Sequence, residues 1–274
     1  MTIDPELQSA HAALVQQFDA VNGAQSNDNN VLASIGSQLA MLKVMLTERD
    51  ILYPQQSDVQ QHKDALVLTR EVLEIGALWS IRVQDTSSFD RYWSQLKPFY
   101  LDLVHALPLS KNYEPIVGLS LLRSLSSNSI ASFHIALESL PMELVRDSPY
   151  IQHPVLLERW LMEGSYSNVW RERENVPLEE YRFFVNILMV TIRHEIASCE
   201  EKAYDTLPLN DVATLLFLDS LPEVLEFAKE RGWHVNPTNQ TIEFANKAVE
   251  PTSENERIPT RSTITTCLLY TSPS

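Results

Sequence analysis

The sequence has 274 residues, of which 44% are hydrophobic, so it is long enough for one large or two modest globular domains. Its 36 acidic and 21 basic residues give a formal net charge of −15, which argues against a phosphate-binding surface and so against nucleic acid as a partner. The two cysteines, Cys199 and Cys267, imply no disulfide framework and fit a reducing compartment. No secretory signal is expected, since the first residues lack a basic start followed by an apolar run.

Up to about residue 175 the pattern predicts α-helices, because apolar residues recur at three- and four-residue steps between polar turns. The expected helices cover residues 6–21, 31–49, 58–83, 87–103, 113–125, 130–140, 154–162 and 166–173. Asp85 or Thr86 is expected to cap the fourth helix, and Pro98 to kink it or stop it early. Short helices joined in pairs predict a solenoid-like array of helical hairpins, although the sequence contains no clean repeat.

A long helix is expected over residues 176–204, and it has the strongest apolar pattern in the chain. Its main face carries apolar residues at helical spacing, namely Tyr181, Phe184, Val185, Leu188, Ile192, Ile196, Cys199 and Ala203. Phe183, Ile187 and Val190 lie on the opposite face, so the first half is expected to be buried on every side. The apolar stretch is too short to span a membrane. We predict that this helix separates one body of protein from another.

The elements after this helix follow the order of a winged-helix domain. Thr206-Leu207 is expected to form a short strand, and Asn210 to cap a helix over residues 211–218. A second helix, 222–231, begins with a proline and stops at Gly232. Apolar and polar residues then alternate around a turn, which predicts a β-hairpin with Trp233 closing the domain core. Beyond Lys247 the chain is polar and patternless, and disorder is expected.

No catalytic, metal or cofactor site is predicted. His194-Glu195 begins like a zinc-protease motif, but Ser198 stands where the second histidine would be. Cys199, on the apolar face, is interpreted as a small buried hydrophobe rather than a nucleophile. The acidic pairs Glu179-Glu180 and Glu200-Glu201 are interpreted as solvated. The chain is therefore not expected to be an enzyme.

A winged helix raises the possibility of nucleic-acid binding, and the charges argue against it. Residues 176–247 contain twelve acidic and six basic residues, the wrong sign for a helix that enters a groove. A winged helix of this charge is expected to serve as a protein interface, in which the edge of its hairpin pairs with a neighbour's strand. The candidate interface residues are Thr241, Ile242, Glu243 and Phe244 of the hairpin and Glu223, Glu226 and Glu230 of the recognition-like helix.

Several segments, in order between about Leu39 and Phe244, resemble one family. They are Arg70-Glu71-Val72-Leu73-Glu74-Ile75-Gly76-Ala77-Leu78-Trp79-Ser80-Ile81, His153-Pro154-Val155, Leu161-Met162-Glu163-Gly164-Ser165-Tyr166, Thr191-Ile192-Arg193-His194-Glu195-Ile196-Ala197, Glu201-Lys202-Ala203-Tyr204 and Arg231-Gly232-Trp233. Helical hairpins, a long helix and a winged helix resemble the PCI architecture. The segments are similar to the small non-ATPase lid subunits of the 26S proteasome, number twelve in that series. The alternatives are the small PCI subunits of the COP9 signalosome or of translation initiation factor three, and, in a different class, a winged-helix nucleic-acid binder.

The resemblance implies a mainly α fold with domains at 1–175 (helical array) and 176–247 (long helix plus winged helix). It implies a scaffold subunit of the regulatory particle in ubiquitin-dependent degradation. The implied partners are other PCI subunits of the lid and, through the assembled lid, the ATPase base. Neither nucleic acid nor a membrane is expected as a partner. The implied location is the cytoplasm and nucleus. The family's tail is an amphipathic helix, which the last residues, 261–274, do not resemble. We expect residues 248–274 to be disordered and this end to be truncated or frame-shifted, which sequencing the native transcript tests.

Overall fold

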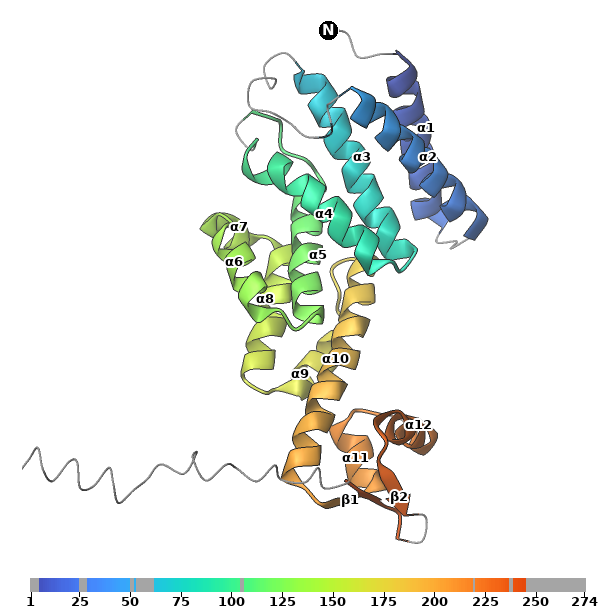
Figure 1. Cartoon of the computed structure of the whole chain (residues 1–274). Helices are drawn as coiled ribbons and strands as arrows, with labels where there is room; N and C mark the ends of the chain where they lie inside the picture. Colours follow the sequence, from blue (N-terminus) through green and yellow to red (C-terminus); the bar gives the residue numbers. More distant parts are fainter. Residues whose placement is uncertain are drawn as a thin grey trace, which may run out of the picture. The chain divides into compact units, whose positions relative to one another are not determined.

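The computed structural model describes residues 5–24, 29–49, 52, 62–103, 106–218, 220–236 and 239–244, and the structural statements below concern these residues. They form twelve helices and three short strands (Figure 1), so the mainly α fold is confirmed. The chain divides into two compact units, residues 1–191 and 192–274, with the boundary inside one long helix. The domain boundary expected after residue 175 stays a prediction. The expected tail, 248–274, lies outside the described residues.

The first four helices of unit 1 are α1 (Pro5–Ala24), α2 (Asn29–Glu48), α3 (Lys63–Arg82) and α4 (Thr86–Leu101). Helix α1 packs against α2, and α3 packs against α4 (Figure 1). By length and composition alone, Asn30–Glu48 could cross a membrane, but core helices of soluble proteins meet the same criterion. Helix α2 buries one leucine- and isoleucine-rich face at helical spacing: Leu32, Ile35, Leu39, Leu42 and Leu46. This periodic burial is that of an amphipathic core helix.

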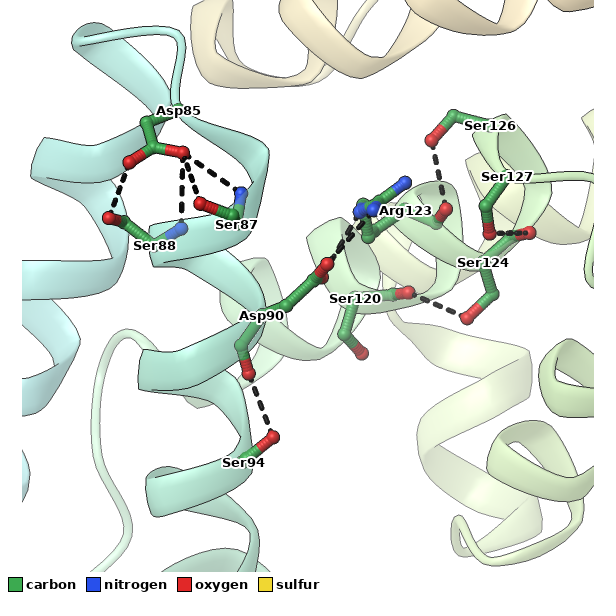
Figure 2. Close-up of polar contacts among 10 residues, drawn as sticks. All are labelled: Asp85, Ser87, Ser88, Asp90, Ser94, Ser120, Arg123, Ser124, Ser126 and Ser127. Carbon is green, nitrogen blue, oxygen red and sulfur yellow. Dashed lines mark hydrogen bonds and ion pairs between the residues drawn. The ribbon is translucent and has the colours of Figure 1, made fainter.

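Asp85, rather than Thr86, caps helix α4. Its carboxylate accepts hydrogen bonds from the backbone N–H groups of Ser87 and Ser88, at 3.0 and 3.2 Å, and from both serine hydroxyls (Figure 2). These bonds, those from Ser88 first, lower the pKa of Asp85 to about 2. The expected early stop at Pro98 is wrong, because the helix continues to Leu101.

A buried network fixes the chain segment that follows α4. Glu74 of α3 is 1% exposed, and its carboxylate accepts hydrogen bonds from the Tyr100 hydroxyl (2.9 Å), the Ser110 hydroxyl (2.8 Å) and the Asn112 side-chain amide (3.2 Å). Arg70, one turn earlier, lies 3.5 Å from the same carboxylate and donates to the Pro108 carbonyl at 2.6 Å. Burial raises the pKa of Glu74, and these donors oppose that rise.

The remaining helices of unit 1 are α5 (Tyr113–Ser126), α6 (Ile130–Glu138), α7 (Met142–Asp147), α8 (Pro149–Met162), α9 (Tyr166–Glu172) and the first part of α10 (Glu179–Ala203). Helix α5 packs against α6 and α8. Helix α8 begins earlier than the expected residue 154, because Pro149 occupies its first turn, where a missing N–H costs nothing, and Pro154 lies inside it. Arg123 of α5 joins Asp90 of α4 through two bonds, of 3.0 and 2.9 Å (Figure 2).

Helix α10 buries its main face in unit 1, as predicted, through Tyr181, Phe184, Val185 and Leu188. The opposite face departs from the prediction of burial on every side, because Val190 is 49% exposed and Phe183 and Ile187 are only half-buried. Aromatic packing strengthens the buried face, with the Phe184 and Phe89 rings 5.1 Å apart in an edge-to-face arrangement.

Gly118 of α5 permits the closest approach in this packing. A Cβ atom at this position would lie 2.0 Å from the Tyr181 hydroxyl and 2.5 Å from the Tyr150 carbonyl oxygen. The Tyr181 hydroxyl donates to the Pro115 carbonyl oxygen at 3.0 Å and lies 3.2 Å from that of Tyr150, so the buried phenol is satisfied. Burial raises the pKa of Tyr181 well above its usual range, so it stays a neutral donor.

Unit 2 contains the end of α10, β1 (Thr206–Pro208), α11 (Leu209–Leu215), α12 (Leu221–Arg231), β2 (His234–Asn236) and β3 (Thr241–Glu243), the predicted winged-helix order. The three strands form an antiparallel sheet in the order β1-β3-β2. Helix α11 begins at Leu209 with Pro208 before it, so the predicted cap at Asn210 is wrong. Helix α12 ends as predicted at Gly232, whose φ of 73° is a left-handed conformation that favours glycine.

We expect Gly118→Ala to lower the free energy of unfolding by about 1–3 kcal/mol, because the new methyl group meets the Tyr181 hydroxyl and a backbone carbonyl. Chemical denaturation of the full chain measures it. A glycine-to-alanine change in an unobstructed helix raises the free energy of unfolding by roughly 0.5–1 kcal/mol. The sign of the measured change therefore shows whether the new methyl group meets an obstruction. The double variant Gly118→Ala/Tyr181→Phe should lose less free energy of unfolding than the two single variants lose in sum, because both changes affect the same contact. A Gly118→Ala variant as stable as the natural chain would contradict this packing.

Candidate protein interface

The candidate interface is built on the core of unit 2. Its buried residues come from the end of α10, from β1, α11, α12 and β3, and from positions next to these elements: Ala197, Leu207, Val212, Leu216, Val224, Ala228, Trp233, Ile242 and Phe244. Val235 of β2 packs against them. Trp233 closes this core as predicted, with its ring edge-to-face against Phe244 at 5.0 Å and against Phe227 at 5.6 Å. Its indole N–H donates to the Glu201 carboxylate at 2.7 Å, which satisfies the polar atom of a largely buried ring.

Two arginines of unit 2 are engaged by its own chain. Arg193 donates to the carbonyl oxygens of Leu216 and Phe217, at 3.1 and 3.2 Å, where α11 ends. Arg231 donates to the His194 carbonyl oxygen and to the Ser198 hydroxyl. These arginines hold α11 and α12 against the end of α10, so their charges serve the fold rather than a phosphate backbone.

Strand β3 lies between β1 and β2, so the expectation that residues 241–244 form the edge of the sheet is wrong. The cause is strand β1, whose Leu207 pairs with Ile242 on the side opposite Val235. The edges are therefore β1 and β2. Ile242 is fully buried and Phe244 is 6% exposed, whereas Thr241 and Glu243 are half-buried. The assignment of these four residues to a protein interface stays a prediction.

Helix α12 presents an acidic and apolar surface. Glu223, Glu226 and Glu230 are all exposed, as an interface would need, and their role in one stays a prediction. Leu221 and Leu225, one turn apart, are 50% and 38% exposed on the same helix. Neither leucine is among the predicted interface residues, although Leu225 directly precedes Glu226 in the sequence. Val224 and Ala228 form the buried face.

Two residues near the end of α10 differ from their predicted environments. Cys199, predicted to be buried, is exposed, because Ala197 rather than Cys199 enters the core of unit 2. Glu200, predicted to be solvated, is 4% exposed, and neither carboxylate oxygen has a hydrogen-bond partner among the described residues. Burial, and then the charge of Glu201, raise the pKa of Glu200 to about 7.

In the described part of the chain, no group of three or more His, Cys, Asp or Glu side chains could hold a metal ion. His194, the start of the zinc-like motif, packs its ring against Phe227, with the ring centres 5.3 Å apart. Its carbonyl oxygen accepts a bond from the Ser198 hydroxyl at 2.9 Å. The histidine and serine of this motif therefore make contacts within unit 2.

The chain matches known proteins over most of its length. The model of the CSN8/PSMD8/EIF3K family matches residues 111–253. The chain is 34% identical to 26S proteasome regulatory subunit RPN12 of Saccharomyces cerevisiae, over 81% of this chain and 82% of that protein. It is 36% identical to 26S proteasome non-ATPase regulatory subunit 8 homolog A of Arabidopsis thaliana, over 85% of each. It is also 38% identical to Schizosaccharomyces pombe rpn12, over 72% of this chain and 71% of that protein.

We expect the stability of unit 2 to fall as pH rises from about 4.5 to about 7. In this window Glu200 keeps its proton in the folded chain, where its pKa is about 7, and loses it in the unfolded chain, where its pKa is near 4.5. The unfolded state then binds fewer protons, so the free energy of unfolding falls, by at most about 1.4 kcal/mol per pH unit.

Glu200→Gln should remove this part of the pH dependence and be more stable than the natural chain at pH 8. Urea denaturation from pH 4.5 to pH 8 measures both effects. Glu226→Gln, at an exposed position of the same unit, is the matched control and should keep the natural slope. If the free energy of unfolding changed equally with pH in the natural chain and in both variants, burial of Glu200 would have no effect on its ionisation.

Proposed function

The chain belongs to the CSN8/PSMD8/EIF3K family, with 26S proteasome regulatory subunits as relatives at 34–38% identity, and we propose that it acts as a non-catalytic scaffold subunit of the proteasome lid. That likeness, which covers most of both chains, is the observation that carries the proposal. In this role the subunit holds neighbouring subunits in place while the regulatory particle assembles. Ubiquitin-dependent degradation then depends on it indirectly, through assembly rather than through a chemical step.

The proposed partners are the other PCI subunits of the lid and, through the assembled lid, the ATPase base. The surface of unit 2 supports a protein partner, because α12 exposes Leu221 and Leu225 among three glutamates. Apolar anchors within a polar rim are typical of protein interfaces. Thr241 and Glu243 contribute through their side chains, since both sides of β3 are already paired within the sheet. The proposed location is that of the assembled particle, the cytoplasm and nucleus.

The charges of unit 2 favour this role over nucleic-acid binding. Recognition of a groove needs cations on the exposed face of the recognition helix. That face carries Glu223, Glu226 and Glu230 against Lys229, while Arg231 bonds within the unit. A nucleic-acid partner would therefore meet like charge where it needs opposite charge, and a basic or apolar protein surface fits better.

Affinity purification of the tagged full chain from cell extract, followed by mass spectrometry, tests the proposal. We expect proteasome lid and base subunits, because a scaffold subunit is retained in its complex. Recovery of signalosome or initiation-factor subunits instead would be consistent with the family to which the chain belongs but would overturn its proposed role in the proteasome. Salt-dependent recovery of nucleic acid without protein subunits would favour the other class.

The double variant Leu221→Asp/Leu225→Asp should reduce recovery of lid subunits about tenfold, because two charges replace apolar anchors at an interface. The leucines are exposed, so the isolated chain should keep its circular dichroism spectrum and melting temperature. Leu109→Asp, at a leucine that is 74% exposed in unit 1, is the control and should be recovered like the natural chain. A folded double variant that recovers lid subunits normally would remove α12 from the interface.

A further inference from the structure

A groove in unit 1 combines cationic and aromatic side chains from three helices. Its volume is about 670 Å³, and its lining includes Lys43 of α2, Trp79 of α3, and Arg91 and Tyr92 of α4. The Trp79 indole N–H donates to the Leu32 carbonyl oxygen of α2 at 2.9 Å, which fixes one wall against another. The groove is therefore a built feature of the packing of α2, α3 and α4.

The two cations of this groove have no acidic partner within the described residues. The Lys43 ammonium lies 3.5 Å from the centre of the Tyr92 ring, a cation–π contact, and the Arg91 guanidinium donates to the Ser88 hydroxyl at 2.8 Å. Asp90 also lines the groove, but it is held by both bonds from Arg123 (Figure 2). Burial, and then the charge of Arg91, lower the pKa of Lys43 to about 8.

Two neighbouring cations without an acidic partner among the described residues are unusual in a chain of net charge −15, where carboxylates are abundant. Holding them together costs free energy by charge repulsion, and Lys43 also loses hydration by its partial burial. A carboxylate placed between them would offset both costs. The half-buried ring of Trp79 would meanwhile cover apolar parts of the molecule that carries that carboxylate, whereas the buried Tyr92 ring supports Lys43 from within.

We propose that this groove binds an acidic segment of a neighbouring protein subunit, with Lys43 and Arg91 pairing with its carboxylates and the half-buried Trp79 packing against its apolar atoms. The inference rests on the proposed function, because it adds a second interface, in unit 1, to the one on the winged helix. Helix α2 also exposes Met41 and Val44, at 64% and 57%, which gives the partner apolar surface beyond the groove.

A protein carboxylate fits this groove better than a nucleic-acid phosphate. The N-terminal N–H groups of α4 at Ser87 and Ser88, which could bind phosphate, already bond to Asp85. Nucleic-acid binding needs a run of cations along the backbone, and this groove has two in a chain that is strongly acidic overall. Two cations flanked by aromatic rings instead match a short acidic peptide segment.

Zero-length cross-linking of the purified intact complex tests the contact directly. A carbodiimide activates a carboxylate, and a contacting amine then displaces the activated group to form an amide. We expect Lys43 to be joined to an Asp or Glu of another protein, because the proposed contact places its amine next to that carboxylate. Lys43→Arg keeps the positive charge but should lose the cross-link. Cross-links from Lys43 only to this same chain, or none, would overturn the proposal.

Charge reversal tests whether the contact matters for assembly. Lys43→Glu/Arg91→Glu should lower the amount of chain recovered in the complex about tenfold, because like charges then face each other. The control Lys63→Glu/Lys111→Glu makes the same charge change at two exposed lysines outside the groove and should assemble normally. Circular dichroism and melting of each free chain confirm folding. Replacing the cross-linked partner acid by lysine should restore assembly of the groove variant.

The outcomes separate the two proposals. A natural chain that enters no proteasome complex would overturn the proposed function itself. Normal entry of both the natural chain and the folded groove variant would overturn only the groove. If the groove variant entered the complex normally but lost a salt-dependent binding to single-stranded RNA that the natural chain shows, that result would overturn the protein partner and assign the groove to phosphate binding.

Discussion

The contact between Tyr181 and Gly118 is the constraint on which the C-terminal half of unit 1 depends. One buried hydroxyl lies within 3.2 Å of carbonyl oxygens from Pro115 of α5 and Tyr150 of α8, so a single group sets the spacing of three helices. The contact exists only because position 118 has no side chain. Phe184 and Leu188 follow at helical spacing and fill the same interface. The Arg70–Glu74 network has the same character, since the buried Glu74 carboxylate binds Tyr100 and Ser110, and Arg70 binds the Pro108 carbonyl.

Much of the fold follows from local sequence signals, because helix formation and capping are local. The spacing of apolar residues identified α10 and its buried face, and Gly232 marked the end of α12. The prediction that Trp233 lies in the core is confirmed. Apolar and polar residues alternate in the hairpin that follows it, so only one face of the hairpin can be buried. By contrast, α7 is one short helix of six residues, too short for a periodic signal.

The candidate site was harder to predict, because its properties arise from tertiary packing. Sequence order places β3 last, but only the folded sheet shows that it lies between β1 and β2. Glu200 follows the pattern of a solvated acid and is nevertheless buried. The groove next to Lys43 combines residues from three helices, and no spacing along the chain relates Lys43 to Arg91. The exposed leucines of α12 were visible in the sequence, yet their exposure was not.

Helix α10 also sets the order in which the chain matures on the ribosome. Its early residues pack against helices that have already been synthesised, whereas Ala197 belongs to a core completed by Ile242. At roughly 5–20 residues per second, that strand emerges on the order of seconds after Ala197. During this interval the apolar side of the nascent winged helix has no sheet to cover it, so it is a ready substrate for chaperones. A chain that ends before β3 would lack Ile242 and Phe244, which complete this core.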